Sequence, residues 1–181
     1  MAGRYLLARC GAQTATERAE NWQFYLRRPL FFAGAPRPWL EDANVQVWRL
    51  LARTTGDDPA LRWLGNLAPQ QTLNVIGPTG NGFPLPETTR RLLLIADETR
   101  APLLLPLVEA VLDRGGRVSL LLITTTGIVR WRPLLPMAVE LRPVSPQDWQ
   151  QSVREGIRRA DQTCAALPDG LLGELSRFVT D

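Results

Sequence analysis

The sequence predicts two domains, a small β-barrel or sandwich followed by a three-layer α/β domain with a parallel sheet. The apolar run at residues 73–76 stops at Gly77-Pro78, and three glycines lie within residues 77–82. A second apolar run, residues 92–96, is continuous and has the length of a parallel strand that is buried on both faces. Short strands with frequent turn signals precede this point and a strand–helix–strand pattern follows it, so the architecture changes between the two runs.

Residues 1–86 are the predicted first domain. Asp58-Pro59 supplies a capping carboxylate and a proline at the first helical position, so a short helix should run to about residue 66 and bury Leu61 and Leu64. A proline-rich turn is expected at residues 36–38. The strands of this domain are expected over residues 5–10, 23–26, 31–33, 45–51 and 72–76.

Residues 87–181 are the predicted second domain, and Pro84-Leu85-Pro86 stiffens the crossing into it. Apolar residues recur at helical spacing over residues 103–112, and Gly115-Gly116 should end that helix. A right-handed crossover then places this helix over one face of the sheet. The remaining elements are strands at residues 92–96, 118–124, 139–141 and 161–166 and helices at residues 146–159 and 171–179.

The composition excludes several kinds of chemistry. Histidine and lysine are absent, and all 21 basic residues are arginine. This rules out an imidazole base or metal ligand, a lysine Schiff base and a phosphate-loop lysine. The arginines are scattered among 18 acidic residues and the net charge is +3, so we expect no nucleic-acid partner.

The chain also lacks targeting and metal-binding signals. No apolar run approaches the ~20 residues of a membrane span and the N-terminus does not read as a secretory signal, so we expect no membrane association and a cytoplasmic location. Cys10 and Cys164 have no neighbour at metal-ligand spacing. This excludes an iron–sulfur cluster held by four thiolates of this chain and predicts buried, inert thiols.

Three segments resemble one known family: residues 27–30 (Arg-Arg-Pro-Leu), residues 62–64 (Arg-Trp-Leu) and residues 72–83, which contain Gly-Pro-Thr-Gly-Asn-Gly-Phe. They are similar to the electron-transfer subunits of dihydroorotate dehydrogenase, which belong to the ferredoxin reductase-like superfamily. The resemblance extends from about residue 3 to about residue 179. It implies an FAD-binding, flavin-reductase-like β-barrel followed by an NAD-binding α/β domain.

The resemblance also implies which residues of the first domain would bind a cofactor. The arginine-proline segment would contact the flavin, and the glycine-rich segment would line it. Both have another interpretation, because Arg28 could instead pair with Glu20 or Asp42, and the glycines suit a tight hinge between domains. The implied cofactor-binding residues are Arg28, Pro29, Leu30, Gly77, Gly80 and Asn81.

The barrel is expected to be incomplete. Residues 2–5 resemble a turn that follows the first barrel strand in the family, so we expect the opening barrel strand to be missing. The open edge should be covered by a protein partner, by the loop at residues 11–22 or by a second copy of the chain, and we expect a homodimer through it. Trp39, Trp131 and Trp149 flank polar loops and are either core residues or part of such a partner surface.

Both turns that would hold cofactor phosphates carry acidic residues. Asp58-Pro59 occupies the turn for the flavin diphosphate, and Asp97-Glu98 stands where the family has glycines in the NAD loop. Phosphates need free amides at a helix start, and a carboxylate repels them by about 1 kcal/mol per charge pair in water. We therefore expect Asp97 and Glu98 to stabilise the helix start instead.

Other positions near the expected cofactors also differ from the family or remain ambiguous. Phe31 replaces a small hydroxyl residue that meets the flavin, and residues 164–166 match the motif beside the nicotinamide only loosely. Residues 124–127 (Thr-Thr-Thr-Gly) end a predicted parallel strand, where α/β sheets place ligands, although they also suit an ordinary polar turn.

Two functions are compatible with these observations. The favoured one is a diverged, non-catalytic accessory protein of an oxidoreductase, with a lost NAD site, a weakened or lost flavin site and no bound cofactor. The alternative is a working electron-transfer subunit that binds FAD. Neither function includes a metal ion or an iron–sulfur cluster.

Overall fold

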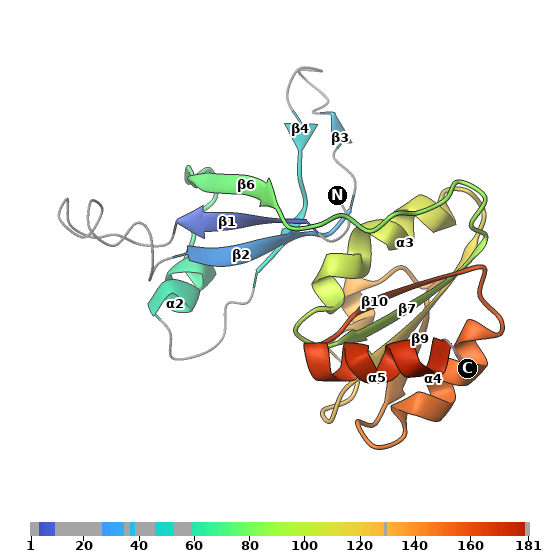
Figure 1. The fold of residues 1–181 in the computed structure, drawn as a ribbon. Helices are drawn as coiled ribbons and strands as arrows, with labels where there is room; N and C mark the ends of the chain where they lie inside the picture. Colours follow the sequence, from blue (N-terminus) through green and yellow to red (C-terminus); the bar gives the residue numbers. More distant parts are fainter. Residues whose placement is uncertain are drawn as a thin grey trace.

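The computed structural model describes residues 4–9, 27–34, 37–38, 46–52, 59–128 and 130–179. These residues form an antiparallel sheet and a parallel sheet, which lie on two sides of the molecule (Figure 1). This arrangement confirms the predicted fold class, a barrel-like sheet that is not closed followed by a three-layer α/β unit.

The antiparallel sheet contains four strands in the order β5-β2-β1-β6. The helix α2 (Pro59–Gly65) covers one face of it, where Ala8, Leu30, Ala60 and Leu64 form a buried cluster. In this described part of the chain β5 and β6 are the edges of the sheet. The strands are β1 (Tyr5–Arg9), β2 (Arg27–Phe32), β5 (Leu50–Leu51) and β6 (Val75–Thr79), and a separate pair is formed by β3 (Arg37–Pro38) and β4 (Gln46–Val47).

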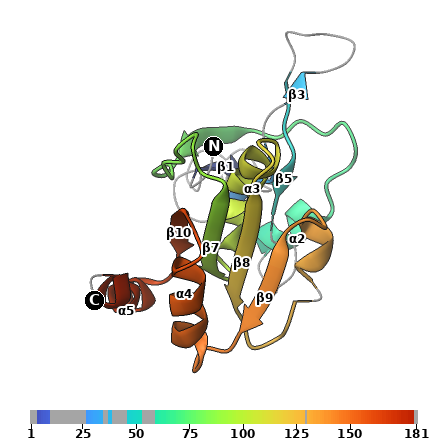
Figure 2. The ribbon, with the colours of Figure 1, turned by 90° about the vertical axis from the view of Figure 1, so that its right-hand side faces the viewer.

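The parallel sheet has the strand order β10-β7-β8-β9 (Figure 2). One face packs against the helix that follows β7, and the opposite face packs against the two C-terminal helices. The strands are β7 (Arg91–Asp97), β8 (Arg117–Ile123), β9 (Glu140–Val144) and β10 (Gln162–Ala166). The helices are η1 (Ala101–Leu104), α3 (Leu105–Leu112), η2 (Arg132–Leu134), α4 (Trp149–Ile157) and α5 (Asp169–Val179).

The residue pattern of β7 explains this three-layer arrangement. Leu92 and Leu94 pack on the α3 side, whereas Leu93 and Ile95 pack on the side of α4 and α5, and all four side chains are buried. Successive residues of a strand point to opposite faces, so a continuous apolar run requires cover on both faces. The predicted helix end is also confirmed, because Gly115 has a φ of +72° and the Gly116 amide donates to the Val111 carbonyl over 2.9 Å.

Several predictions for the first sheet were wrong in detail. The strand expected at residues 45–51 is split into β4 and β5, and the turn expected at residues 36–38 contains β3, which pairs with β4. The strand expected at residues 72–76 is shifted to 75–79 and passes through Gly77-Pro78. In α2, Leu64 is buried as expected, but Ala60 is the second buried residue and Leu61 is half-buried. The strand expected at residues 23–26 lies outside the described residues.

Two tryptophans assigned to a possible partner surface belong to the core. Trp149 is 1% exposed in the cluster under α4, and Trp131 is 8% exposed on the α3 side. Each follows a polar loop in the sequence, but its ring folds back onto the sheet. The interface interpretation is therefore wrong for both, and Trp39 lies outside the described residues.

Candidate functional site

The carboxyl ends of β7 and β8 lie next to each other, because the two strands are parallel and pair from Arg91↔Arg117 to Asp97↔Ile123. Glu98 follows β7, and Thr124 follows β8. The hydroxyls of Thr124 and Thr126 each donate to Oε1 of Glu98 over 2.7 Å. The Thr126 amide in turn donates to the Thr124 hydroxyl over 3.0 Å. One carboxylate therefore joins the loops after the two strands.

Asp97 binds the turn before the helix. Its Oδ1 accepts the Arg100 amide over 2.7 Å, and its Oδ2 accepts Nη1 of the Arg100 guanidinium over 2.8 Å. The expectation that acids stabilise the helix start is thus met by Asp97 only. For Glu98 it was wrong, because this carboxylate turns to the threonines of the neighbouring loop.

The helix entrance after β7 offers few amides to a ligand. Pro102 has no N–H, and the Leu103 amide donates to the Arg100 carbonyl over 2.9 Å. The Leu105 amide donates to the Pro102 carbonyl. A dinucleotide phosphate at such an edge needs glycines and free amides. The residues of this loop do not fit a pyrophosphate group.

The residues expected to contact a flavin lie in the antiparallel sheet. In β2, Arg28, Pro29 and Leu30 pair with Ala8, Leu7 and Leu6 of β1, and Leu7 and Ala8 pair with Ile76 and Val75 of β6. The arginine-proline segment and the start of the glycine-rich segment are therefore separated by one strand. The structure brings these two parts of the predicted site onto one sheet.

The strand register separates Leu30, Gly80 and Asn81 from the other predicted cofactor-binding residues. Leu30 is 4% exposed and packs under α2, so it is a core residue and faces away from Pro29 on the opposite face. Gly80 and Asn81 are exposed beyond the end of β6. Gly80 follows Thr79, whose row contains Phe31, and that row lies about 10 Å along the strands from the row of Arg28.

Gly77 has a structural reason to be glycine. The pairing of β1 with β6 shifts between Tyr5 and Leu7, so β6 bulges at this point. Gly77 has a φ of +134°, and a Cβ there would lie 3.1 Å from the Tyr5 carbonyl oxygen. Its position inside β6 does not match the predicted hinge between domains. Residues 80–90, which contain the other two glycines of this segment, connect β6 to β7.

The position that holds a hydroxyl residue in the family is aromatic here. Phe31 is half-buried, and its ring centroid lies 6.1 Å from that of Tyr5 at an interplanar angle of 49°. Pro29 lies two residues away, on the same face of β2. This face therefore carries an apolar and aromatic surface, and the alternative pairings of Arg28 with Glu20 or Asp42 involve residues outside the described part.

The sequence did not predict one polar contact, which joins α3 to the segment before β5. Glu109 of α3 pairs with Arg49 over 2.7 Å, and Arg37 lies 4.0 Å from the same carboxylate oxygen. Arg49 also donates to the Ala33 carbonyl over 3.0 Å. The available signal was that Glu109 is a lone charge within the apolar helix at residues 105–112.

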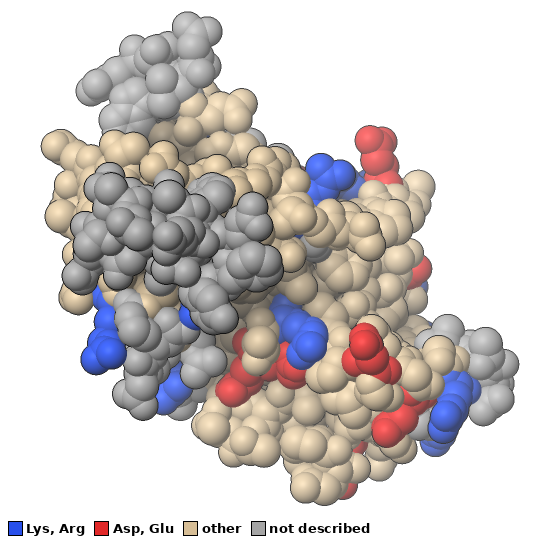
Figure 3. All heavy atoms as spheres, turned by 60° about the vertical axis from the view of Figure 1, so that its left-hand side comes forward, with Lys and Arg blue, Asp and Glu red and all other residues tan. Residues whose placement is uncertain are grey.

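The described residues hold no group of three or more His, Cys, Asp or Glu that could bind a metal ion. Cys164 is a free, buried thiol, and burial raises its pKa. No described helix is long and apolar enough to cross a membrane. On the face drawn in Figure 3, acidic and basic side chains of the described residues lie close to one another rather than in one broad basic area.

Comparison with known proteins supports a ferredoxin reductase-like relationship. No protein-family model matches the chain. The electron transfer subunit of dihydroorotate dehydrogenase B (NAD(+)) from Geobacillus sp. (strain WCH70) is 34% identical over 96 residues, which are 52% of this chain and 34% of that protein. The alignment therefore spans about a third of the relative's length.

Solved structures of reductases share the fold at low sequence identity. The ferredoxin reductase in carbazole 1,9a-dioxygenase (FAD apo form) has a TM-score of 0.63 at 16% identity, covering 99% of this chain and 54% of that one. The NADH-dependent reduced ferredoxin-NADP oxidoreductase has a TM-score of 0.62 at 13% identity, covering 99% and 62%. Ferredoxin-NADP+ reductase from Plasmodium falciparum with 2'P-AMP has a TM-score of 0.59 at 7% identity, covering 100% and 79%. The two-domain fold predicted from the sequence is thereby confirmed.

Proposed function

We propose that this chain is a diverged, non-catalytic relative of flavin-dependent electron-transfer subunits and acts as an accessory protein of an oxidoreductase. Its domains are residues 1–86 and 87–181, and the second does not bind NAD. The observation that carries this proposal is the pair of 2.7 Å hydrogen bonds from Thr124 and Thr126 to Glu98.

A pyrophosphate at this edge would meet carboxylates and hydrogen-bond donors that are already in use. In open α/β sheets the ligand binds outside the carboxyl ends of the strands. Here the hydroxyl donors at that position are already used by Glu98, and the Arg100 amide is used by Asp97. Each carboxylate would also repel a phosphate charge by about 1 kcal/mol at 4 Å in water, and by more when desolvated. Binding would therefore require breaking internal bonds and overcoming like-charge repulsion.

An accessory role requires a protein partner, and the antiparallel sheet has a suitable edge. Val75 and Ile76 of β6 are 42% and 40% exposed, and β6 is an edge strand of the described sheet. Exposed apolar residues on an unpaired strand favour pairing with another chain. The similar Geobacillus protein is an electron transfer subunit. We propose that β6 contacts either an oxidoreductase or a second copy of this chain, in the cytoplasm.

The alternative function, an FAD-binding electron-transfer subunit, has support from a different observation. Arg28 and Pro29 lie across a single strand from Val75 and Ile76, and Pro29, Leu7 and Ile76 form one apolar row. A flavin ring could rest on such a surface, and this face is distinct from the edge that Glu98 closes. FAD is therefore the cofactor to test for this alternative function, which includes no iron–sulfur cluster.

An absorption spectrum of the purified protein and thermal melts with FAD and with NADH separate the two functions. We expect no visible flavin absorption and no melting shift with either molecule. A shift with FAD that Arg28→Gln abolishes, while Arg62→Gln leaves it intact, would establish the alternative. A shift with NADH would contradict the proposed closure of the β7–β8 edge.

A further inference from the structure

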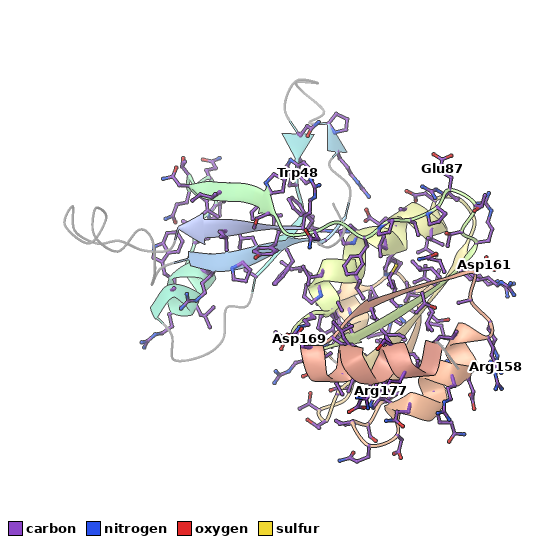
Figure 4. All side chains as sticks on the ribbon, viewed as in Figure 1. Trp48, Glu87, Arg158, Asp161, Asp169 and Arg177 are labelled. Carbon is purple, nitrogen blue, oxygen red and sulfur yellow. The ribbon has the colours of Figure 1, made fainter. Side chains whose placement is uncertain are left out.

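A pocket of about 170 Å³ lies at the opposite edge of the parallel sheet, where the strands begin. It opens between the sheet and the end of α4. Asp161 precedes β10 and Asp169 follows it, and Figure 4 shows the two on opposite sides of the α/β unit. The pocket lies at the Asp161 edge, because Arg91 starts β7 and Arg117 starts β8. It is therefore separate from the edge that Glu98 closes.

Strand register concentrates arginines in this pocket. Arg91 pairs with Arg117 across β7 and β8, and Arg142 lies on β9 opposite Leu121, two residues beyond the Ser119–Glu140 pair. These positions share the sheet face that packs against α4, and Arg159 approaches from the end of that helix. Residues that lie far apart in the sequence thus converge on one cavity.

The charges of the pocket do not cancel. Arg91 pairs with Asp161 over 2.7 Å, and Arg142 pairs with Glu140. Arg117 and Arg159 form no salt bridge within the described part of the chain. Four arginines against two carboxylates leave an excess of two positive charges. An anion is the ligand that this excess favours.

The internal carboxylates hold the arginines in place. Oδ2 of Asp161 accepts the Arg90 and Arg91 amides over 3.1 and 2.9 Å, and its Oδ1 accepts Nε of Arg91 over 2.9 Å. Glu140 accepts the Ser119 hydroxyl and Nε of Arg142, each over 2.8 Å. The hydrogen bond from Ser119 and then that from Arg142 lower the pKa of Glu140. Both guanidinium groups are therefore fixed before a ligand arrives, and they remain 63% and 40% exposed.

We propose that this pocket binds a small, multiply charged phosphate-type anion. Guanidinium groups bind such oxygens through pairs of charge-assisted hydrogen bonds. Pockets for drug-sized ligands are typically ~300–1,000 Å³, so the 170 Å³ here suits an inorganic anion or one phosphate group of a larger molecule. The proposal does not depend on whether the protein binds FAD or NAD.

Calorimetric titration with inorganic pyrophosphate at fixed ionic strength tests whether the pocket binds such an anion. We expect the wild-type chain to bind pyrophosphate, and Arg117→Gln and Arg159→Gln each to weaken binding roughly ten-fold or more, as loss of a charge-assisted hydrogen bond does. Glu140→Gln removes a negative charge from the pocket but keeps a side-chain oxygen that accepts from Arg142, so it should tighten binding several-fold. Titration with a simple phosphate monoester then distinguishes a free anion from the phosphate end of a metabolite.

Arg158→Gln is the matched control. Arg158 is the neighbour of Arg159, is exposed and does not line the pocket (Figure 4). Arg158→Gln removes the same charge as Arg159→Gln, so a non-specific electrostatic effect would weaken pyrophosphate binding equally in both variants. Equal weakening by Arg158→Gln, or no pyrophosphate binding by a wild-type chain with an intact melting transition, would overturn the proposal. If Arg117→Gln does not fold, Arg159→Gln decides, because its side chain leaves from the end of a helix.

Discussion

Replacing Glu98 with alanine tests the bond network that closes the β7–β8 edge. The substitution removes two hydrogen bonds of 2.7 Å from threonine hydroxyls to a carboxylate. Hydrogen bonds to charged groups contribute ~1.5–3 kcal/mol each when buried. Glu98 is only half-buried, and the hydroxyl oxygens of Thr124 and Thr126 lie 3.3 Å apart, so the two hydroxyls can still bond to each other. We therefore expect the free energy of unfolding to fall by about 2 kcal/mol in total. For a chain of this length that is a melting temperature lower by about 4–8 °C.

Urea unfolding and thermal melts of the Glu98→Ala chain measure this loss. Glu87→Ala is the control, because Glu87 is exposed on the connection before β7 (Figure 4), and it should change stability by less than about 0.5 kcal/mol. A double-mutant cycle with Thr126→Val should give a coupling energy of about 1 kcal/mol. A coupling near zero, or equal stability of the Glu98 and Glu87 variants, would refute the assigned role of Glu98.

Three further predictions concern the parallel sheet. Leu94→Ala, at a side chain that is 0% exposed, should lower the free energy of unfolding in urea by ~2–5 kcal/mol. Leu172→Ala, at a side chain that is 37% exposed, should lower it far less. Equal losses would contradict the assigned core. Arg91 lowers the pKa of Asp161, so the stability that this carboxylate adds is complete above the ordinary aspartate pKa of about 3.9 and is lost as the pH falls through the lowered value. Asp161→Asn should thus be less stable than wild type at neutral pH, and the difference should shrink in unfolding experiments below about pH 4; a pH-independent difference would argue against it. Gly116→Ala would place a Cβ 2.8 Å from the Arg90 carbonyl oxygen and should lower the free energy of unfolding by ~1–3 kcal/mol. Gly173→Ala, which meets open space in α5, should raise the free energy of unfolding by ~0.5–1 kcal/mol. Melting shifts of the same sign in the two variants would contradict the assigned role of the backbone contact at Gly116.

The elements of the parallel-sheet domain could be predicted to within about three residues from local patterns. The strands predicted at residues 92–96 and 118–124 are β7 at 91–97 and β8 at 117–123. Continuous apolar runs and helical spacing report burial on one or both sides of an element, which is encoded locally. The first sheet was harder, because its strands are short and their limits are set by the neighbours with which they pair. Gly77 illustrates this: a bulge opposite β1 keeps it inside a strand that the sequence pattern ended one residue earlier.

The residue types alone determined which chemistry is absent and where acids replace glycines. Without histidine or lysine, no folding of the chain can supply an imidazole or a side-chain amine, and the two acids Asp97 and Glu98 follow the apolar run at residues 92–96 in any arrangement. Only the tertiary structure decided the partner of each charge. Glu98 meets threonines 26 and 28 residues away, Glu109 meets Arg49 60 residues away, and four arginines from separate elements line one pocket. Such contacts depend on strand order and register, which are set by the packing of the whole sheet and leave no local trace in the sequence.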